Sequence, residues 1–227
     1  KLARLYFSYW LLARGKWKAG WKGFECRLEA GLVEKAPGCP LWLGQPLEGK
    51  QILIYGEQRL GDEIMFASCL EEVISAGARC ALICDPRLVN LLRRSFPDIE
   101  ILSGQAPLQG KLSDHDFDYQ LPIGSLPKYF RNRDEDFPGR RAYLKACNRH
   151  VDYWKKRLDG LGPGLKVGIS WRGGTLGTRR ALRSIQLDAF LPLLDDGRHF
   201  VSLQYDECSE EIANFGGRHG KLIHHWT

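Results

Sequence analysis

Apolar side chains in the first 36 residues recur at the three- to four-residue spacing of an α-helix. The pattern breaks at Gly15 and then resumes, so residues 1–36 are predicted to form two helices joined by a short turn. Residues 37–50 are rich in proline and glycine, which is typical of a linker, and Trp42 is its expected anchor. A lone helix pair cannot bury its apolar face, so we expect it to pack against the next domain or against further helices.

From residue 51 the pattern changes to short apolar runs that alternate with helical periodicity. Runs typical of buried strands occupy residues 51–55, 79–84, 99–102 and 118–121, and helical patterns occupy residues 64–74 and 86–96. Strands that alternate with helices form parallel sheets, because each helical crossover returns the chain to the same end of the sheet. Residues 51–160 are therefore predicted to form an α/β domain with a doubly wound sheet of the Rossmann type.

A second α/β domain is predicted over residues 165–227, after a break in composition at residues 160–164. Its predicted strands are residues 166–171, 200–204 and 221–224, and its predicted helices are residues 187–194 and a short one after Ser209, preceded by a helix over residues 152–158. Two or three strands do not complete a doubly wound sheet, so we expect this domain to be incomplete within the chain.

The loop Gly56–Glu63, after the first predicted strand, is the strongest candidate for chemistry. Ligands of open α/β sheets bind beyond the carboxyl ends of the strands, where this loop lies. Gly61 would let a ligand approach the backbone closely, and Glu63 either favours the first helical turn or contacts substrate. Asp62 has two interpretations: a cap for free backbone N–H groups, or a general base that removes a proton from an acceptor hydroxyl.

A second candidate site follows predicted strand 166–171, where glycines and arginines are concentrated. Backbone N–H groups and guanidinium groups together suit a diphosphate, whereas the alternative is a solvated basic loop. The candidate substrate-binding residues here are Trp171, Arg172, Gly173, Arg179, Arg180, Arg183 and Ser184. Two further candidates, Ser125 and Gln204, lie at the ends of other predicted strands.

The chain of 227 residues carries a net charge of +6 and has a pI of about 9.0. This charge suits an anionic partner such as a nucleotide diphosphate. A nucleic-acid partner is not expected, because no recognised nucleic-acid motif occurs and charges of both signs are interspersed. A membrane span is not expected either, since no run approaches 18 consecutive apolar residues.

Seven cysteines, an odd number without a Cys-x-x-Cys pair, argue against a disulfide framework and a zinc site. Several lie in apolar runs, which indicates buried thiols in a reducing compartment. No secretory signal is evident, so a cytoplasmic location is predicted. No metal site is expected, because His224 and His225 are adjacent and diverge on a strand.

Five stretches of the chain resemble, in the correct order, bacterial proteins in which a glycosyltransferase region follows tetratricopeptide repeats. The family patterns are G-x-W-x-x-G-W-x-x-[YF]-E-x-R, W-x-G-x-P-L-x-G-[KR]-x-[IL]-L, G-E-Q-G-L-G-D, V-G-[IL]-x-W-x-G and R-S-[IL]. They correspond here to Gly15–Arg27, Trp42–Leu53, Gly56–Leu70, Val167–Gly173 and Arg183–Ile185. The Leu-Gly-Asp loop is also similar to that of the heptosyltransferases, and the architecture to that of the O-GlcNAc transferases.

The resemblance implies the GT-B architecture, a pair of Rossmann-type domains preceded here by the end of a helical repeat array. It implies transfer of a sugar from a nucleotide-diphosphate sugar to a hydroxyl, on a protein side chain as one plausible acceptor bound through the repeats. It also implies that no cofactor and no metal is needed. In the heptosyltransferases the aspartate of this loop is the proposed base, which gives that role to Asp62, and Trp171–Arg183 would face the donor diphosphate.

The sequence departs from the family pattern at Arg59, where the family has glycine, and at Ser68, where it usually has arginine. A later family segment, D-T-[AG]-x-x-H-x-A-G-[AS]-L-G-[KR]-P, does not occur in these residues, so the chain alone is expected to bind donor poorly. These departures keep open a second interpretation, a non-catalytic interaction module with a degenerate glycosyltransferase fold.

Overall fold

The computed structural model describes residues 1–33, 38–57, 59–104, 117–137, 139, 142–174, 180–205 and 207–226. The chain forms two compact units, Lys1–Cys147 and Asn148–Thr227. The predicted boundary after residue 160 is therefore displaced, because helix α8 (Asn148–Asp159) belongs to the second unit. The Trp154 ring of α8 lies 5.8 Å from that of Trp226, and the Arg157 guanidinium lies 4.9 Å from the same ring.

The first unit opens with the predicted helix pair, α1 (Leu2–Ala13) and α2 (Trp17–Phe24), followed by a short third helix, α3 (Cys26–Glu29). Two glycines of α2 let α1 approach closely. An added Cβ would lie 2.5 Å from Leu12 Cδ2 at Gly20 and 2.9 Å from Ser8 Cβ at Gly23. The spacing of small residues in α2 thus sets how tightly the two helices pack.

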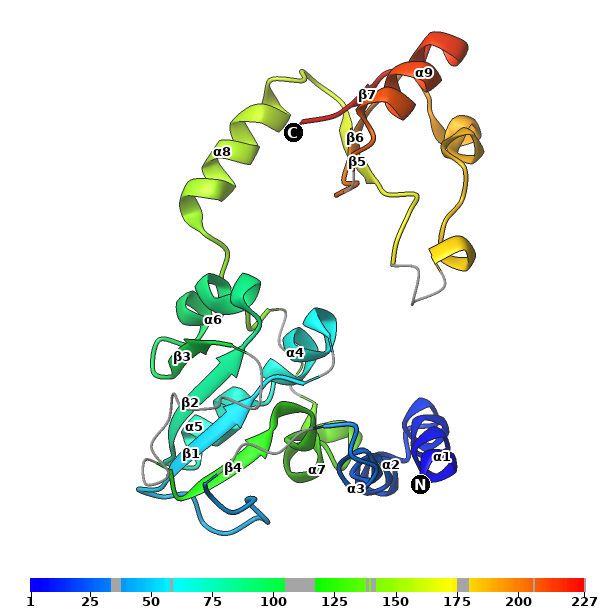
Figure 1. The fold of residues 1–227 in the computed structure, drawn as a ribbon. Coiled ribbons are helices and arrows are strands. Elements are labelled where there is room, and N and C mark those ends of the chain that lie inside the picture. Colours follow the sequence, from blue (N-terminus) through cyan, green and yellow to red (C-terminus); the bar gives the residue numbers. More distant parts are fainter. Residues whose placement is uncertain are drawn as a thin grey trace. The chain divides into compact units, whose positions relative to one another are not determined.

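Four parallel strands form the sheet of the first unit, in the order β3-β2-β1-β4 (Figure 1). The strands are β1 (Gln51–Tyr55), β2 (Arg79–Cys84), β3 (Glu100–Ser103) and β4 (Tyr119–Pro122). The segments between and after them are α4 (Leu60–Ala67), α5 (Leu70–Ser75), α6 (Val89–Ser95), α7 (Pro127–Phe130) and the 3₁₀ turns η1 (Pro86–Leu88), η2 (Ile123–Ser125) and η3 (Asp134–Asp136). The four strand predictions are confirmed to within one residue at each end.

The single helix predicted over residues 64–74 is instead two helices, α4 and α5, which are interrupted at Ser68 and Cys69. The Ser68 hydroxyl donates to the Met65 carbonyl oxygen at 2.7 Å. The Ser68 carbonyl oxygen accepts a hydrogen bond from Arg131 Nη2 at 2.9 Å. Local side-chain and tertiary hydrogen bonds therefore replace the helical ladder at this point, where the periodicity of apolar residues gave no sign of a break.

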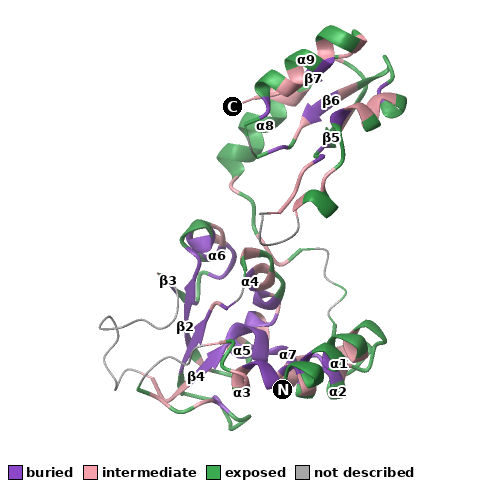
Figure 2. Cartoon of the chain, turned by 45° about the vertical axis from the view of Figure 1, so that its right-hand side comes forward, coloured by how far each residue is buried: buried purple, intermediate pink, exposed green. Residues whose placement is uncertain are grey.

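Both faces of the first sheet are buried (Figure 2). Ile52, Ile54 and Leu82 belong to the main core, which also includes apolar residues of α2, α4, α5 and α6. Tyr55 and Ile83 point to the opposite face, which packs with side chains such as Phe117. Continuous apolar strands were the sequence signal for this two-sided burial.

The predicted linker is fixed to the sheet through Trp42, whose side chain is buried. Its ring lies 4.2 Å from the Tyr129 ring, and its backbone N–H donates to the Gln120 carbonyl oxygen at 2.9 Å. The expectation that Trp42 anchors this segment is confirmed.

The second unit contains a three-stranded parallel sheet in the order β5-β6-β7. Its elements after α8 are β5 (Leu165–Ile169), η5 (Arg180–Arg183), η6 (Leu187–Leu193), β6 (Arg198–Ser202), α9 (Ser209–His219) and β7 (Ile223–His224). The α-helix predicted over residues 187–194 is a 3₁₀ helix instead. Pro192 lies inside it and cannot donate the backbone hydrogen bond that an α-helix requires.

The fold is mixed α/β with parallel sheets, as predicted at that level. Five of the seven cysteines are buried, namely Cys26, Cys69, Cys80, Cys84 and Cys208. Burial raises the pKa of the Cys69, Cys80 and Cys84 thiols to about 12, so these side chains act as apolar core groups. In the described part of the chain, no helix combines the length and the apolar character needed to cross a membrane.

The close contact of α1 and α2 generates a stability prediction. Gly23→Ala should lower the free energy of unfolding by about 1–3 kcal/mol, because the new methyl group overlaps Ser8. Gly61→Ala is the matched control in helix α4, since its Cβ would meet no described heavy atom within 4 Å, and it should be neutral or stabilising by up to about 1 kcal/mol. Urea unfolding measures both values, and equal effects of the two substitutions would contradict the packing argument.

Candidate functional site

Strand β1 lies at the point where the order of the first sheet reverses, because β2 follows on one side of it and β4 lies on the other. The carboxyl ends of β1 and β4 are neighbours, with Tyr55 opposite Pro122. In open α/β sheets, ligands bind in the crevice at such a switch point. The loop after β1 begins at this position, and three of the candidate residues, Gly61, Asp62 and Glu63, follow it in the first turn of α4.

The switch point is occupied by a buried ion pair between Glu57 of the β1–α4 loop and Arg27 of α3. Arg27 Nε donates to Glu57 Oε2 at 2.8 Å, and Arg27 Nη2 donates to Glu57 Oε1 at 2.7 Å. Both side chains are 1% exposed. The guanidinium carbon also lies 4.1 Å from the centre of the Phe24 ring. The charged side chain of Arg27, from helix α3, thus fills the position where a ligand binds in other sheets of this kind.

Two further side chains complete this buried cluster, Glu25 and Ser125. The Ser125 hydroxyl donates to Glu25 Oε1 at 2.8 Å and accepts from Arg27 Nη2 at 2.9 Å. Ser125 is fully buried, so we assign it to the cluster rather than to substrate binding, which was the expectation from its place at the end of β4. The backbone N–H of Gly124 donates to Glu57 Oε1 at 2.7 Å, which joins the loops after β1 and β4.

Asp62 lies in the first turn of α4, and its side chain is half-buried. The helix begins after Arg59, and no described group donates a hydrogen bond to the Asp62 carboxylate. Asp62 is therefore not the helix cap that one interpretation of the sequence required. Among the described residues, its carboxylate remains available to a ligand.

The phenol of Tyr9, on α1, belongs to the same neighbourhood. Burial raises its pKa, the positive charge of Arg27 opposes that rise, and the negative charges of Asp62 and Glu57 add to it. The ring of Tyr9 packs 5.9 Å from that of Phe24. The first helix therefore lies near the loop that carries Asp62.

Glu63 is buried and anchors the start of α4 to the loop after β2. Its Oε2 accepts a hydrogen bond from the Asp85 N–H at 2.9 Å. The carboxylate also lies over Gly56, where an added Cβ would be 2.5 Å from the carboxyl carbon. Burial raises the pKa of Glu63, although the Asp85 N–H bond opposes the rise. The expected contact of Glu63 with substrate is thus replaced, in this structure, by an internal anchoring bond.

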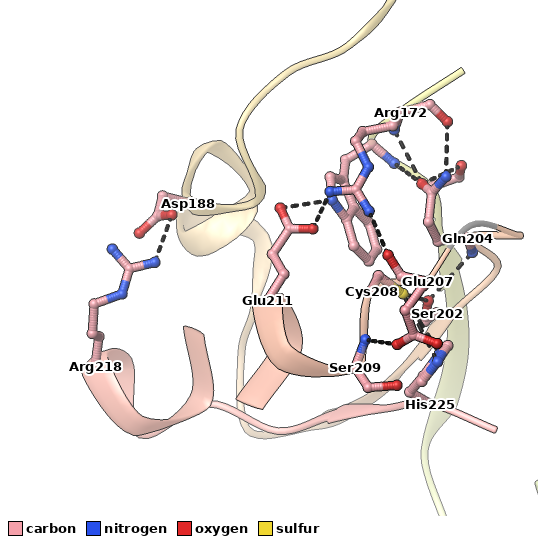
Figure 3. Close-up of polar contacts among 12 residues, drawn as sticks. Arg172, Asp188, Ser202, Gln204, Glu207, Cys208, Ser209, Glu211, Arg218 and His225 are labelled. Carbon is pink, nitrogen blue, oxygen red and sulfur yellow. Dashed lines mark hydrogen bonds and ion pairs between the residues drawn. The ribbon is translucent and has the colours of Figure 1, made fainter. Parts of the chain in front are cut away.

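In the second unit, Gln204 fixes the turn that follows β5 (Figure 3). Its Oε1 accepts from the backbone N–H groups of Trp171 at 3.3 Å and Arg172 at 3.1 Å. Its Nε2 donates to the Arg172 carbonyl oxygen at 3.1 Å. The amide of Gln204 therefore occupies the backbone groups that the sequence assigned to a diphosphate.

Arg172 is itself engaged by helix α9. Its Nη1 forms an ion pair with Glu211 Oε2, and its Nη2 donates to the Glu207 carbonyl oxygen at 3.3 Å. Trp171, which is buried, donates from Nε1 to Glu211 Oε1 at 3.1 Å. Glu211 was not predicted as a site residue, because its two partners lie about forty positions earlier in the sequence.

The remaining candidates of the second unit lie beyond Gly173. Arg179 falls outside the described residues. Arg180 and Arg183 lie in η5, where Arg183 is exposed, and the Ser184 hydroxyl donates to the Arg180 carbonyl oxygen at 2.8 Å. The Ile185 N–H donates to the Trp171 carbonyl oxygen at 3.0 Å, which holds this arginine turn beside the end of β5.

An open hollow of about 700 Å³ lies between the turn after β5 and the start of α9. Its lining comprises Arg172, Glu207, Cys208, Ser209, Glu210, Glu211, Asn214 and Arg218. Three of these residues are acidic and two are basic, so the hollow is not a strongly cationic surface. Within the described ranges, no three His, Cys, Asp or Glu side chains are grouped so as to hold a metal ion.

Comparison with known proteins supplies one informative match. The chain is similar to Protein FlbA of Caulobacter vibrioides. The two are 36% identical over 220 aligned residues, which cover 89% of this chain and 37% of the relative. The aligned part of this chain is longer than either unit, so at least part of each unit has a counterpart in the relative. The chain spans little more than a third of that protein. No family model matches the chain, and no solved structure matches it.

The sequence singled out the two segments, together with Gln204, Ser125 and Glu63, but it did not identify Arg27, Glu57 or Glu211 as residues that organise them. Arg27 and Glu57 lie within two of the five quoted motifs, Gly15–Arg27 and Gly56–Leu70. They are 30 positions apart, and nothing in the local sequence shows that they pair. Their signal was their chemistry, since a charged residue inside an apolar pattern needs a buried partner. Among the candidate side chains that the structure describes, Asp62 and Arg183 have no hydrogen bond or ion pair that would keep a ligand away.

The raised pKa of Glu63 predicts a pH-dependent gain from Glu63→Gln. The ionised carboxylate is disfavoured in the folded chain, so wild-type stability falls as the pH rises through the folded-state pKa. Glutamine keeps an oxygen acceptor for the Asp85 N–H without the charge. We expect a higher midpoint of thermal unfolding than wild type at pH 8, and a difference that shrinks towards pH 4.

The exposed Glu48, in the same unit, provides the control Glu48→Gln, which should leave the midpoint unchanged at both pH values. A Glu63→Gln protein that is less stable than wild type at pH 8 and equal to it at pH 4 would reverse the sign and contradict this account.

Proposed function

We propose that this protein is a glycosyltransferase that moves a sugar from a nucleotide-diphosphate sugar to a hydroxyl acceptor. The proposal includes the GT-B arrangement of two Rossmann-type units, with the acceptor on the first unit and the donor on the second. Its main support is Asp62, a half-buried carboxylate with no described hydrogen-bond donor, in the first helical turn after β1. The all-parallel order β3-β2-β1-β4 supports the Rossmann part of this proposal, because the strand order of that fold, 3-2-1-4-5-6, begins in the same way.

The buried cluster around Arg27 supports the assignment of the acceptor to the first unit. A nucleotide normally binds at the switch point of such a sheet, with its phosphates against the first helix. Here Arg27 and Glu57 fill that position and satisfy each other's charge. The donor nucleotide is therefore assigned to the second unit.

The proposed reaction is a displacement at the anomeric carbon of the donor sugar. Asp62 accepts the proton of the acceptor hydroxyl while the hydroxyl oxygen forms a bond to that carbon. The bond from the same carbon to the diphosphate oxygen breaks, and the diphosphate leaves with the bonding electron pair. The negative charge that develops on the leaving diphosphate is proposed to be stabilised by Arg180 and Arg183, with backbone N–H groups of the turn after β5 that contains Gly173. Neither a cofactor nor a metal is part of this proposal.

A second candidate function is a non-catalytic interaction module. It is favoured by the internal engagement of Arg172 with Glu211, and of the neighbouring N–H groups with Gln204. The arginine at position 59 instead of the family's glycine also favours it. A location in the cytoplasm and a protein acceptor stay predictions under either proposal.

The donor assignment predicts selective stabilisation by one nucleotide. UDP, GDP, CDP and ADP are each tested at about 1 mM, together with their nucleotide sugars. We expect one of these nucleotides to raise the midpoint of thermal unfolding of the full-length protein. A ligand at a hundredfold excess over its Kd stabilises the native state by about 2.7 kcal/mol. Arg183→Ala should abolish the shift. Arg198→Ala is the control that should preserve it, because Arg198 lies at the amino end of β6 and not in η5. No shift with any nucleotide would favour the interaction module.

The base assignment predicts that Asp62→Asn lowers turnover of the stabilising nucleotide sugar by about 10²–10⁴-fold. The thermal midpoint should stay within a degree or two of wild type, because the carboxylate has no described internal partner. Steady-state release of the nucleotide diphosphate measures the rate. Full turnover in the Asp62→Asn protein would remove Asp62 from this role.

A further inference from the structure

We propose that Arg27 positions the β1–α4 loop, so that the helical segment Lys1–Ala30 is a working part of the site. The claim that this loop is catalytic rests on the function proposed above, whereas the claim that Arg27 orders the loop stands on geometry alone.

The first step of the argument is that Arg27 is held without remaining freedom. A guanidinium group has five N–H donors, and all five have partners in the structure. Nε and one Nη2 donor bind Glu57, the other Nη2 donor binds Ser125, and the Nη1 donors bind Glu25 Oε1 at 2.7 Å and the Phe24 carbonyl oxygen at 3.3 Å. A lysine could satisfy at most three of these acceptors and lacks the planar fork that matches a carboxylate.

The second step is that Glu57 passes this constraint to two loops. Its carboxylate accepts two bonds from Arg27 and one from the Gly124 N–H. Gly124 is adapted to this contact, since an added Cβ would lie 2.2 Å from Glu57 Oε1. Glu57 therefore fixes the chain two residues after β1 and one residue after η2 begins.

The third step is that Asp62 lies between two anchored carboxylates. Glu57, five positions before it, is tied to the helical segment, and Glu63, immediately after it, is tied to the Asp85 N–H. The backbone N–H groups of Asp62 and Glu63 both donate to the Arg59 carbonyl oxygen, at 2.9 and 3.0 Å. Loss of the Arg27 anchor would remove one of the two carboxylate anchors that flank Asp62.

The chain offers a matched control in Arg131, a second buried arginine of the same unit. Arg131 Nη1 pairs with Glu72 Oε1 at 2.9 Å, and its Nη2 binds the Ser68 carbonyl oxygen at the far end of α4. Arg131→Met removes an ion pair whose arginine is also buried, although Glu72 is 25% exposed, and no described contact joins this pair to the β1–α4 loop. General destabilisation of the unit is thus separated from loss of loop order.

The test is hydrogen exchange of full-length wild-type, Arg27→Met, Arg27→Lys and Arg131→Met proteins, read in peptides that span residues 56–66. We expect both Arg27 substitutions to speed exchange of these amides by about tenfold or more, and Arg131→Met to leave them at the wild-type rate. Arg27→Lys covers the case in which Arg27→Met does not fold. Equal exchange in the Arg27 and Arg131 variants would overturn the proposal.

A second measurement uses the double variant Arg27→Met, Glu57→Gln, which removes both charges and keeps an acceptor for the Gly124 N–H. We expect its midpoint of thermal unfolding to be higher than that of Arg27→Met and closer to that of the wild type. Its kcat for the nucleotide sugar should stay at least about tenfold below wild type, with KM changed less than about twofold. Recovery of kcat together with stability would show that the cluster is only structural, which overturns the proposal.

Failure of the proposed function is distinguishable from failure of this inference. If wild-type protein turns over none of the nucleotide sugars tested, the glycosyltransferase proposal fails. The exchange measurement needs no substrate and still decides whether Arg27 orders the loop.

Discussion

The pairing of Arg27 with Glu57 is the interaction on which the arrangement of the first unit depends. It joins the helical segment, the loop after β1 and the loop after β4 at one buried point. Burying two charges has a large desolvation cost, which only close geometry and further hydrogen bonds offset. Here every guanidinium donor has an acceptor, so the cluster holds three segments in one relative position. Loss of one partner from such a pair typically destabilises a protein by about 3–5 kcal/mol.

In the proposed function, this cluster also limits where a ligand binds in the first unit. The crevice at the switch point of the first sheet, which holds nucleotides in many α/β proteins, is filled by Arg27. Asp62 lies in the first turn of α4, near Tyr9, and no described group donates a hydrogen bond to its carboxylate. In the proposed function, this carboxylate suits a hydroxyl-bearing acceptor better than a bulky anionic nucleotide, which the negative charge of Asp62 would repel.

In the second unit, internal contacts fix the turn after β5 and leave an arginine beside it exposed. Gln204 and Glu211 fix the turn after β5, and the exposed Arg183 follows in a turn that returns to Trp171. The groups that a simple motif argument assigns to phosphate are therefore partly structural, and they define the frame that holds the more exposed arginines. The similarity to Protein FlbA extends over parts of both units.

The sequence by itself determined the strands, most of the helices and the two loops, because apolar periodicity reflects burial along a single element. It placed β1 and β2 at their observed bounds, and it singled out Asp62 and Gln204, which lie in the segments that follow β1 and β6. The break between α4 and α5, the 3₁₀ character of η6 and the place of α8 in the second unit depended on contacts from distant residues. The same is true of the partners of Ser125, Glu63 and Arg172. Only the tertiary structure decided these, because a hydrogen bond between residues 30 to 100 positions apart leaves no periodic trace in the chain.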